Sequence, residues 1–176
     1  NGHYVSQLKM TDNLAVVKGS LIVDLAISNH PDLINSFLIE DSIHIDTLPP
    51  KIERISHKSV RPNGTVLPVG LDQNLIIRMV GEARSMARFR IEADNFSVIG
   101  EMFDDGKHDD QKIDDGIYSG FYTVSPGDNV SRGKLIGLLR DSADNTSQLV
   151  SNMPVVLDTD PPEIQSIAYT VKRPQQ

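Results

Sequence analysis

The hydrophobic residues of this chain fall in short stretches separated by turn-forming residues, a pattern typical of all-β proteins. In residues 86–91 the charged Arg88 and Arg90 alternate with Phe89 and Ile91, so one face of this segment is expected to be buried and the other solvated. Similar stretches predict strands at 52–57, 74–80, 86–93, 96–103, 117–124, 134–140 and 149–157. We therefore predict an all-β fold, an antiparallel β-sandwich with little helix.

The chain also contains an internal repeat, which bears on its domain organisation. The sequence DTLPPKI at 46–52 returns as DTDPPEI at 158–164, which begins 112 residues later. Upstream, KGSLI at 18–22 matches RGKLI at 132–136 with a separation of 114 residues. The same order of matches on both sides favours a true repeat over coincidence.

The two separations differ slightly, so a length change is expected in the loop-like stretch 28–35 or in its counterpart 142–147. Just before this loop, the apolar stretch 21–27 is long enough to form a short helix. Its β-branched residues and its match with 135–139 favour a strand instead.

The repeat predicts three parts: the C-terminal half of a sandwich repeat at 1–48, a complete repeat at 49–160 and the first strand of a further repeat at 161–176. Paired prolines stand at both junctions. Proline lacks an N–H for the sheet and keeps the preceding residue extended, which suits the start of an edge strand. We expect a longer parent polypeptide to supply the strands that the first part lacks, those equivalent to 49–114.

Composition narrows the classes of partner. The chain has 17 Lys and Arg against 24 Asp and Glu, a net charge of −7, which disfavours nucleic acid as a partner. No apolar run approaches the roughly 20 residues that cross a bilayer, so we expect no membrane insertion. The absence of cysteine excludes disulfides and cysteine-ligated zinc, and it is compatible with export.

The most unusual local feature is an acidic segment at 104–116, which contains six Asp and two Lys. Clustered carboxylates with glycines that free backbone carbonyls suit calcium, which takes six to eight oxygen ligands. The spacing is not that of an EF-hand. The expected ligands are three aspartates spaced five apart and then two neighbours: Asp105, Asp110, Asp115, Asp104 and Asp114. The alternative is a solvated pair of turns in which Asp side chains accept hydrogen bonds from nearby backbone N–H groups.

The run DDGKHDDQKIDDGIY at 104–118 resembles the DDGxxGDxxxxDGIY signature of immunoglobulin-like domains in large bacterial exported proteins, including those called choice-of-anchor domains. It is also similar to a run in the β-sandwich region of calcium-activated chloride channel regulators. Strand order and the DTxPPxI junction extend the resemblance over most of 46–164. One departure is Asp109, which stands where the signature commonly has glycine.

The resemblance implies tandem immunoglobulin-like antiparallel β-sandwich repeats, usually extracellular spacers or adhesive modules without a catalytic site. The motifs agree, since no G-x-S-x-G, phosphate-binding loop or G-x-G-x-x-G is present. We therefore expect a non-catalytic structural or adhesive module, extracellular or at the cell surface. Its expected partners are neighbouring repeats or other copies of the chain.

Two alternatives remain open from the sequence. One is a carbohydrate-binding accessory domain of an extracellular enzyme, in which Tyr118, Phe121 and Tyr122 form an aromatic platform for surface glycans. The other is a subunit of an extracellular filament.

Overall fold

The computed structural model describes residues 5–7, 9–11, 14–27 and 29–170. These residues form ten strands: β1 Ala15–Ile27, β2 His30–Asp46, β3 Ile52–His57, β4 Asn74–Gly81, β5 Met86–Ala93, β6 Phe96–Met102, β7 Ile117–Thr123, β8 Val130–Arg140, β9 Thr146–Val150 and β10 Val155–Leu157. Among the described residues there is no helix that is long and apolar enough to span a membrane. The all-β prediction is confirmed, and the stretch 21–27 lies in a strand.

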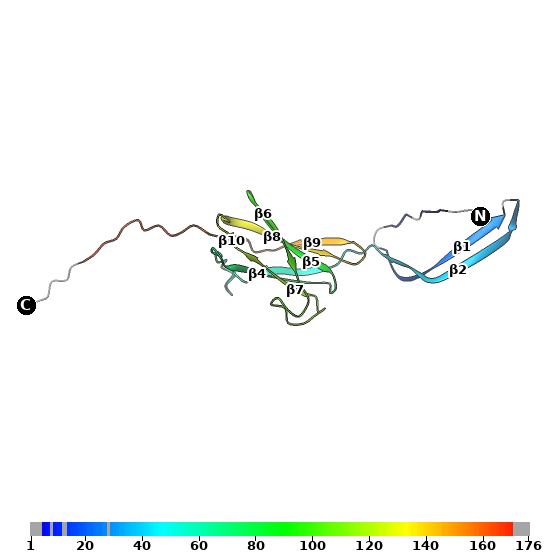
Figure 1. Cartoon of the computed structure of the whole chain (residues 1–176), viewed down its shortest axis with the longest axis horizontal. Coiled ribbons are helices and arrows are strands. Elements are labelled where there is room, and N and C mark those ends of the chain that lie inside the picture. Colours follow the sequence, from blue (N-terminus) through cyan, green and yellow to red (C-terminus); the bar gives the residue numbers. More distant parts are fainter. Residues whose placement is uncertain (1–4, 8, 12–13, 28, 171–176) are drawn as a thin grey trace, which may run out of the picture.

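Strands β3 to β10 form two antiparallel sheets that face each other. One sheet has the order β3-β4-β7, and the other has the order β10-β8-β5-β6 with β9 also paired to β8. The hairpin of β1 and β2 extends from one end of this sandwich, and the C-terminal segment leaves from the other end (Figure 1). Residues 161–170 carry no strand pairing, so the first strand expected at 161–176 stays a prediction.

The predicted strands 52–57 and 86–93 have the same bounds in the structure. The predicted strand 149–157 is instead divided between β9 and β10. The break has a local cause, because Pro154 has no N–H for the sheet and the N–H of Met153 donates to Ser151 Oγ at 3.2 Å.

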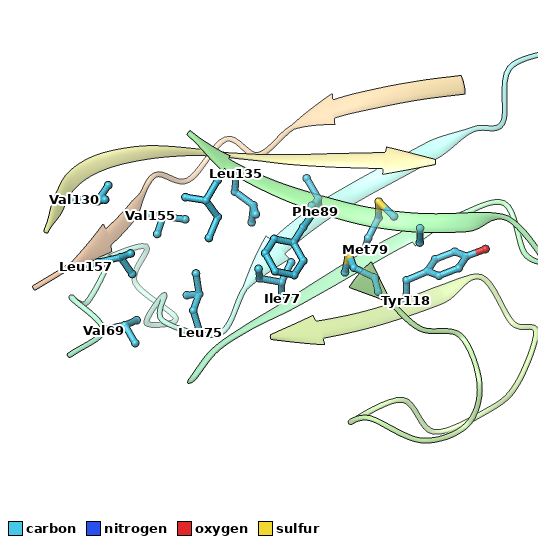
Figure 2. Close-up of a cluster of buried hydrophobic side chains, with 14 of the residues drawn as sticks. Val69, Leu75, Ile77, Met79, Phe89, Tyr118, Val130, Leu135, Val155 and Leu157 are labelled. Atoms are coloured by element: carbon cyan, nitrogen blue, oxygen red, sulfur yellow. The ribbon is translucent and has the colours of Figure 1, made fainter. Parts of the chain in front are cut away.

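The core lies between the inner faces of the two sheets. Ile77 and Met79 of β4 meet Phe89 of β5 and Leu135 of β8, and all four side chains are buried (Figure 2). The alternation in β5 places Phe89 and Ile91 inside, as predicted. Each such side chain contributes about 1.5 to 3 kcal/mol on burial.

Tyr118 fixes β7 against the connection between β4 and β5. Its ring is buried, its hydroxyl donates to the carbonyl of Glu82 at 2.6 Å, and it accepts from the N–H of Ser85 at 3.0 Å. Burial raises the pKa of the Tyr118 hydroxyl. The hydroxyl thus satisfies two backbone groups that would otherwise lose hydrogen bonds at the sandwich edge.

The hairpin of β1 and β2 has the same register as the pairing of β8 with β9 and β10. A separation of 114 residues relates β1 to β8, and a separation of 112 residues relates β2 to the segment that contains β9 and β10. The pairs Val16↔Ile45, Gly19↔Ile43, Ile22↔Leu38, Val23↔Phe37, Asp24↔Ser36, Leu25↔Asn35 and Ala26↔Ile34 correspond to Val130↔Leu157, Gly133↔Val155, Ile136↔Val150, Gly137↔Leu149, Leu138↔Gln148, Leu139↔Ser147 and Arg140↔Thr146.

The irregularities of the two hairpins also correspond. The register shift between Val16 and Gly19 matches the one that separates the Val155 and Leu157 pairs. The difference in loop length lies between β1 and β2 on one side and between β8 and β9 on the other. This is the region in which the sequence comparison placed it.

His57 provides a test of how the sandwich responds to acid. It is buried, its Nε2 lies 3.0 Å from the carbonyl oxygen of Pro154, and its Nδ1 lies 2.6 Å from Ser59 Oγ. Since a carbonyl only accepts, Nε2 carries the proton and Nδ1 accepts from the serine. Burial lowers the pKa of His57 below 6.5, and hydrogen bonds to backbone carbonyls only partly oppose this.

The folded chain therefore binds this proton less readily than the unfolded chain, and the free energy of unfolding should fall as the pH drops below about 6.5. Urea unfolding at a series of pH values between 7.5 and 5 measures this slope. His57→Gln should flatten it, whereas His30→Gln, at an exposed position, should not. An unchanged slope in the His57 variant would contradict the assignment.

Candidate metal centre

The acidic segment forms the connection between β6 and β7. Its base is closed by two backbone hydrogen bonds between Phe103 and Ser119, at 2.8 and 2.9 Å. Ser119 Oγ also donates to the carbonyl of His108 at 2.7 Å. The loop is therefore attached to the buried start of β7, next to the tyrosine that enters the core.

The backbone of this loop reverses direction several times. Gly106, His108, Asp109, Asp114 and Gly116 all have positive φ angles, between 52° and 78°. Asp109, at the position where the signature has glycine, has a φ of 68°. Aspartate is one of the few residues that tolerate this left-handed conformation, so Asp109 can occupy a backbone position that commonly requires glycine.

Two cations, Lys58 directly after β3 and Arg78 in β4, hold Asp109 in place. Its Oδ2 accepts from Lys58 Nζ at 2.6 Å and from Arg78 Nη2 at 3.2 Å. The hydrogen bond from Lys58 is the main cause of the lowered pKa of Asp109. Because all three side chains are exposed to a substantial degree, this contact positions the loop more than it stabilises the fold.

Three carboxylates converge in the loop. Asp104, Asp110 and Asp115 each offer an oxygen, and these oxygens lie within 4.8 Å of one another. Asp104 is fixed by two backbone donors, the N–H of Asp115 at 3.1 Å and that of Gly116 at 2.9 Å. Asp110 accepts from the N–H of Gly106 at 2.8 Å.

The donor set fits a metal ion. Two unit negative charges at this separation repel by about 1 kcal/mol in water and by several times more where water is excluded. Three carboxylates offer six oxygens, and each oxygen keeps a lone pair after accepting one N–H. A hard cation that prefers oxygen ligands would remove the repulsion and use these free lone pairs.

The other two predicted ligands have different partners. Asp105 accepts from the N–H of Lys107 at 2.9 Å, and its second oxygen lies 3.0 Å from Nδ1 of His108. Asp114 Oδ2 lies 3.3 Å from Arg84 Nε. The structure thus brings Asp104 together with Asp110 and Asp115, whereas Asp105 accepts hydrogen bonds within a local turn and Asp114 pairs with Arg84.

Sequence reasoning missed the basic residues that orient the loop. Lys58 and Arg78 come from β-sheet segments distant in the chain, and no local spacing links them to Asp109. In the sequence, Asp109 stood out as a departure from the signature, but the positive φ of this residue was not predicted.

The three aromatic residues of the predicted platform do not share a surface. Tyr118 is in the core, and Tyr122 packs edge-on against Phe96 with ring centroids 5.9 Å apart. The Tyr122 hydroxyl donates to Asp128, and burial followed by this hydrogen bond raises its pKa to about 12. Phe121 is exposed on the opposite face of β7.

The described residues include open surface grooves, and three of them concern the question of catalysis. The first lies on the outer face of the five-stranded sheet beside Met86, Arg88 and Ile99. The others lie near the loops at 94–96 and 84–86. None of these three grooves is lined by a histidine that could act as a base toward a neighbouring hydroxyl.

Comparison with known proteins adds no assignment, because no protein-family model and no curated protein matches this chain.

Gly116 gives a test of the loop geometry. Its φ is 78°, and a Cβ at this position would lie 2.3 Å from the carbonyl oxygen of Gly81, whose N–H donates to Gly116 at 2.9 Å. Gly127 also has a positive φ, 90°, but a Cβ there would meet nothing within 4 Å. The two glycines therefore separate backbone strain from steric clash.

Gly127→Ala should lower the free energy of unfolding by about 1 kcal/mol, the cost of a left-handed conformation for a residue with a Cβ. Gly116→Ala should lower it several-fold more, because the β4 backbone must also move. Chemical denaturation of both variants measures the difference, and equal losses would show that the close approach to Gly81 is unimportant.

Proposed function

We propose that this chain is a non-catalytic structural or adhesive segment of an extracellular or cell-surface protein, built from tandem immunoglobulin-like β-sandwich repeats. The strand order supports this proposal, since a three-stranded antiparallel sheet faces a larger one that contains β5, β6, β8 and β9. Sandwiches of this kind are common among surface-exposed modules. A likeness of fold alone does not define a function, so further observations are needed.

The observation that carries the proposal is the shared register of the two hairpins. Seven strand pairs and the adjoining β-bulge recur at the separations found in the sequence. Bulges are specific features of a fold and do not recur at matched positions by general strand propensity. Two hairpins built to the same plan within one chain favour an array of sandwiches, and the family resemblance implies that such arrays act as spacers or adhesive modules.

The non-catalytic part of the proposal rests on the sequence motifs, which include no G-x-S-x-G, phosphate-binding loop or G-x-G-x-x-G. The clustered carboxylates lie in one loop, and Asp104 and Asp114 line the groove near 84–86. General acid–base chemistry needs groups within hydrogen-bonding reach of a bound substrate. The separated aromatic residues likewise give little support to the carbohydrate-binding alternative.

We further propose that the acidic loop binds calcium through Asp104, Asp110 and Asp115. Their oxygens are close enough to share one ion, and carboxylates on a loop with several backbone reversals match the flexible coordination of calcium better than that of magnesium. Binding would fix the loop against β7 and stiffen one edge of the sandwich.

A calcium-dependent melting temperature tests this. Free calcium at about 100 times Kd should stabilise the fold by about 2.7 kcal/mol, which corresponds to a shift of several degrees between calcium and chelator. Asp110→Asn should abolish the shift while keeping an oxygen for the N–H of Gly106. Asp105→Asn, in the same loop but outside the cluster, should retain the shift. Identical melts of the unaltered chain in calcium and chelator would exclude the site.

The proposed extracellular or cell-surface location can be tested by antibody labelling of intact cells. An antibody raised against residues 49–160 should label intact cells of the source organism, or their extracellular material, without permeabilisation. An antibody against a cytoplasmic protein serves as the control for leakage. Labelling that appears only after permeabilisation would contradict an extracellular role.

A further inference from the structure

The β1–β2 hairpin presents an apolar surface to solvent. Leu21, Val23, Leu25 and Phe37 lie on one face of the hairpin, and each is exposed by more than a third of its area. Ile22 and Leu38 are exposed on the opposite face. A two-stranded hairpin is only marginally stable alone, and a contiguous apolar face such as the first marks an interaction surface.

The matching hairpin in the same chain shows which side of this surface is covered. Leu25 is 42% exposed, but its counterpart Leu139 is 1% exposed in the sandwich core. Leu38 is 56% exposed, and its counterpart Val150 remains 48% exposed on the outer face. The two faces of the β1–β2 hairpin can therefore be distinguished, and the inner one carries Leu21, Val23 and Leu25.

The strands that cover the matching hairpin of β8 and β9 can be identified in the sandwich. The inner face of β8 packs against β3 and β4, so that a Cβ on Gly137 would lie 2.6 Å from Met79 Sδ and 2.9 Å from Ile55 Cδ1. On its other edges β8 pairs with β5 and β9. The strands that complete such a hairpin are thus those contained in residues 49–114.

A second copy of this chain has no such strands to offer. Its own β4 and β5 already pack against β8, and Ile77, Met79 and Phe89 are exposed by 1% or less. The partner that covers the β1–β2 hairpin must therefore be a separate set of strands, with apolar and polar residues alternating as in residues 49–114.

We propose that the inner face of the β1–β2 hairpin docks a separate strand set patterned like residues 49–114, which closes it into a second sandwich. The inference rests on the proposed repeat organisation and adds the partner of this face. One position makes the partner specific. Val23 stands at the position that Gly137 has in β8. In β8, Ile55 and Met79 pack over this glycine. The docked strands must therefore place smaller side chains over Val23 than Ile55 and Met79.

A fusion tests the docking. Residues 49–114 are placed ahead of residue 1 of the full chain, with Val23→Gly to give the space that Gly137 provides in β8. Amide hydrogen exchange at residues 21–26 should slow at least a hundredfold relative to the unfused chain, because these amides become part of a cooperative unit. The same fusion with Val23 retained should show a smaller gain. Amides of residues 135–139 are the internal reference for correct folding.

Two further variants of the fusion provide the matched control. Leu25→Asp should remove the new protection, because its counterpart is in the core, whereas Leu38→Asp should leave it. If the reference amides are lost in the fusion, the separate 49–114 polypeptide is added to the full chain carrying Val23→Gly, and the same amides are measured. Absence of new protection with the reference intact, or equal effects of the two Asp variants, would overturn the proposal.

The competing explanation is that a second copy of this chain covers the hairpin face. If the unfused chain forms dimers or polymers in light scattering and Leu25→Asp dissociates them, the face is covered by a second copy and the proposal is wrong. Neither calcium-dependent melting nor surface labelling uses this hairpin, so failure here would not by itself contradict the proposed function.

Discussion

The rest of the structure depends on covering the inner face of β8. Leu135 and Leu139 project from this strand into the space between the sheets, and Gly137 between them lets Met79 approach the backbone. Strand side chains alternate, so a strand with large apolar residues on one face is stable only when another sheet covers that face. The three-stranded sheet covers this face of β8. Among the described residues, no sheet covers the equivalent face of β1.

The acidic loop depends on the same packing through Tyr118 and Ser119. These buried residues start β7 and fix the loop base through Phe103. From this base the chain must reverse several times within few residues, and the left-handed positions fall on glycine, aspartate and one histidine. The convergence of the carboxylates is therefore a consequence of backbone reversals that the sandwich edge supports.

The strands could be predicted because alternation in each segment is a local property, as the agreement of 52–57 and 86–93 shows. The split of 149–157 was missed because apolar residues stand on both sides of Ser151 and Asn152, so the stretch was read as one strand, although 151–154 lie outside the sheet. In the loop, the equal spacing of Asp105, Asp110 and Asp115 predicted these three as metal ligands. In the structure, Asp105 contacts His108 instead, and Asp104 lies beside Asp110 and Asp115. That choice depends on the reversals at 108 and 109, which cations distant in sequence support.

The two hairpins share a register but differ at a position on the inner face. The shared bulge preserves the twist and the assignment of inner and outer faces. The substitution of valine for glycine between Val23 and Gly137 changes the depth of the groove on the inner face without changing the register. Interiors are packed closely enough that a side chain of this size excludes Met79 and Ile55 from the same position. If the proposed array is correct, differences of this kind would prevent strands of one unit from closing another.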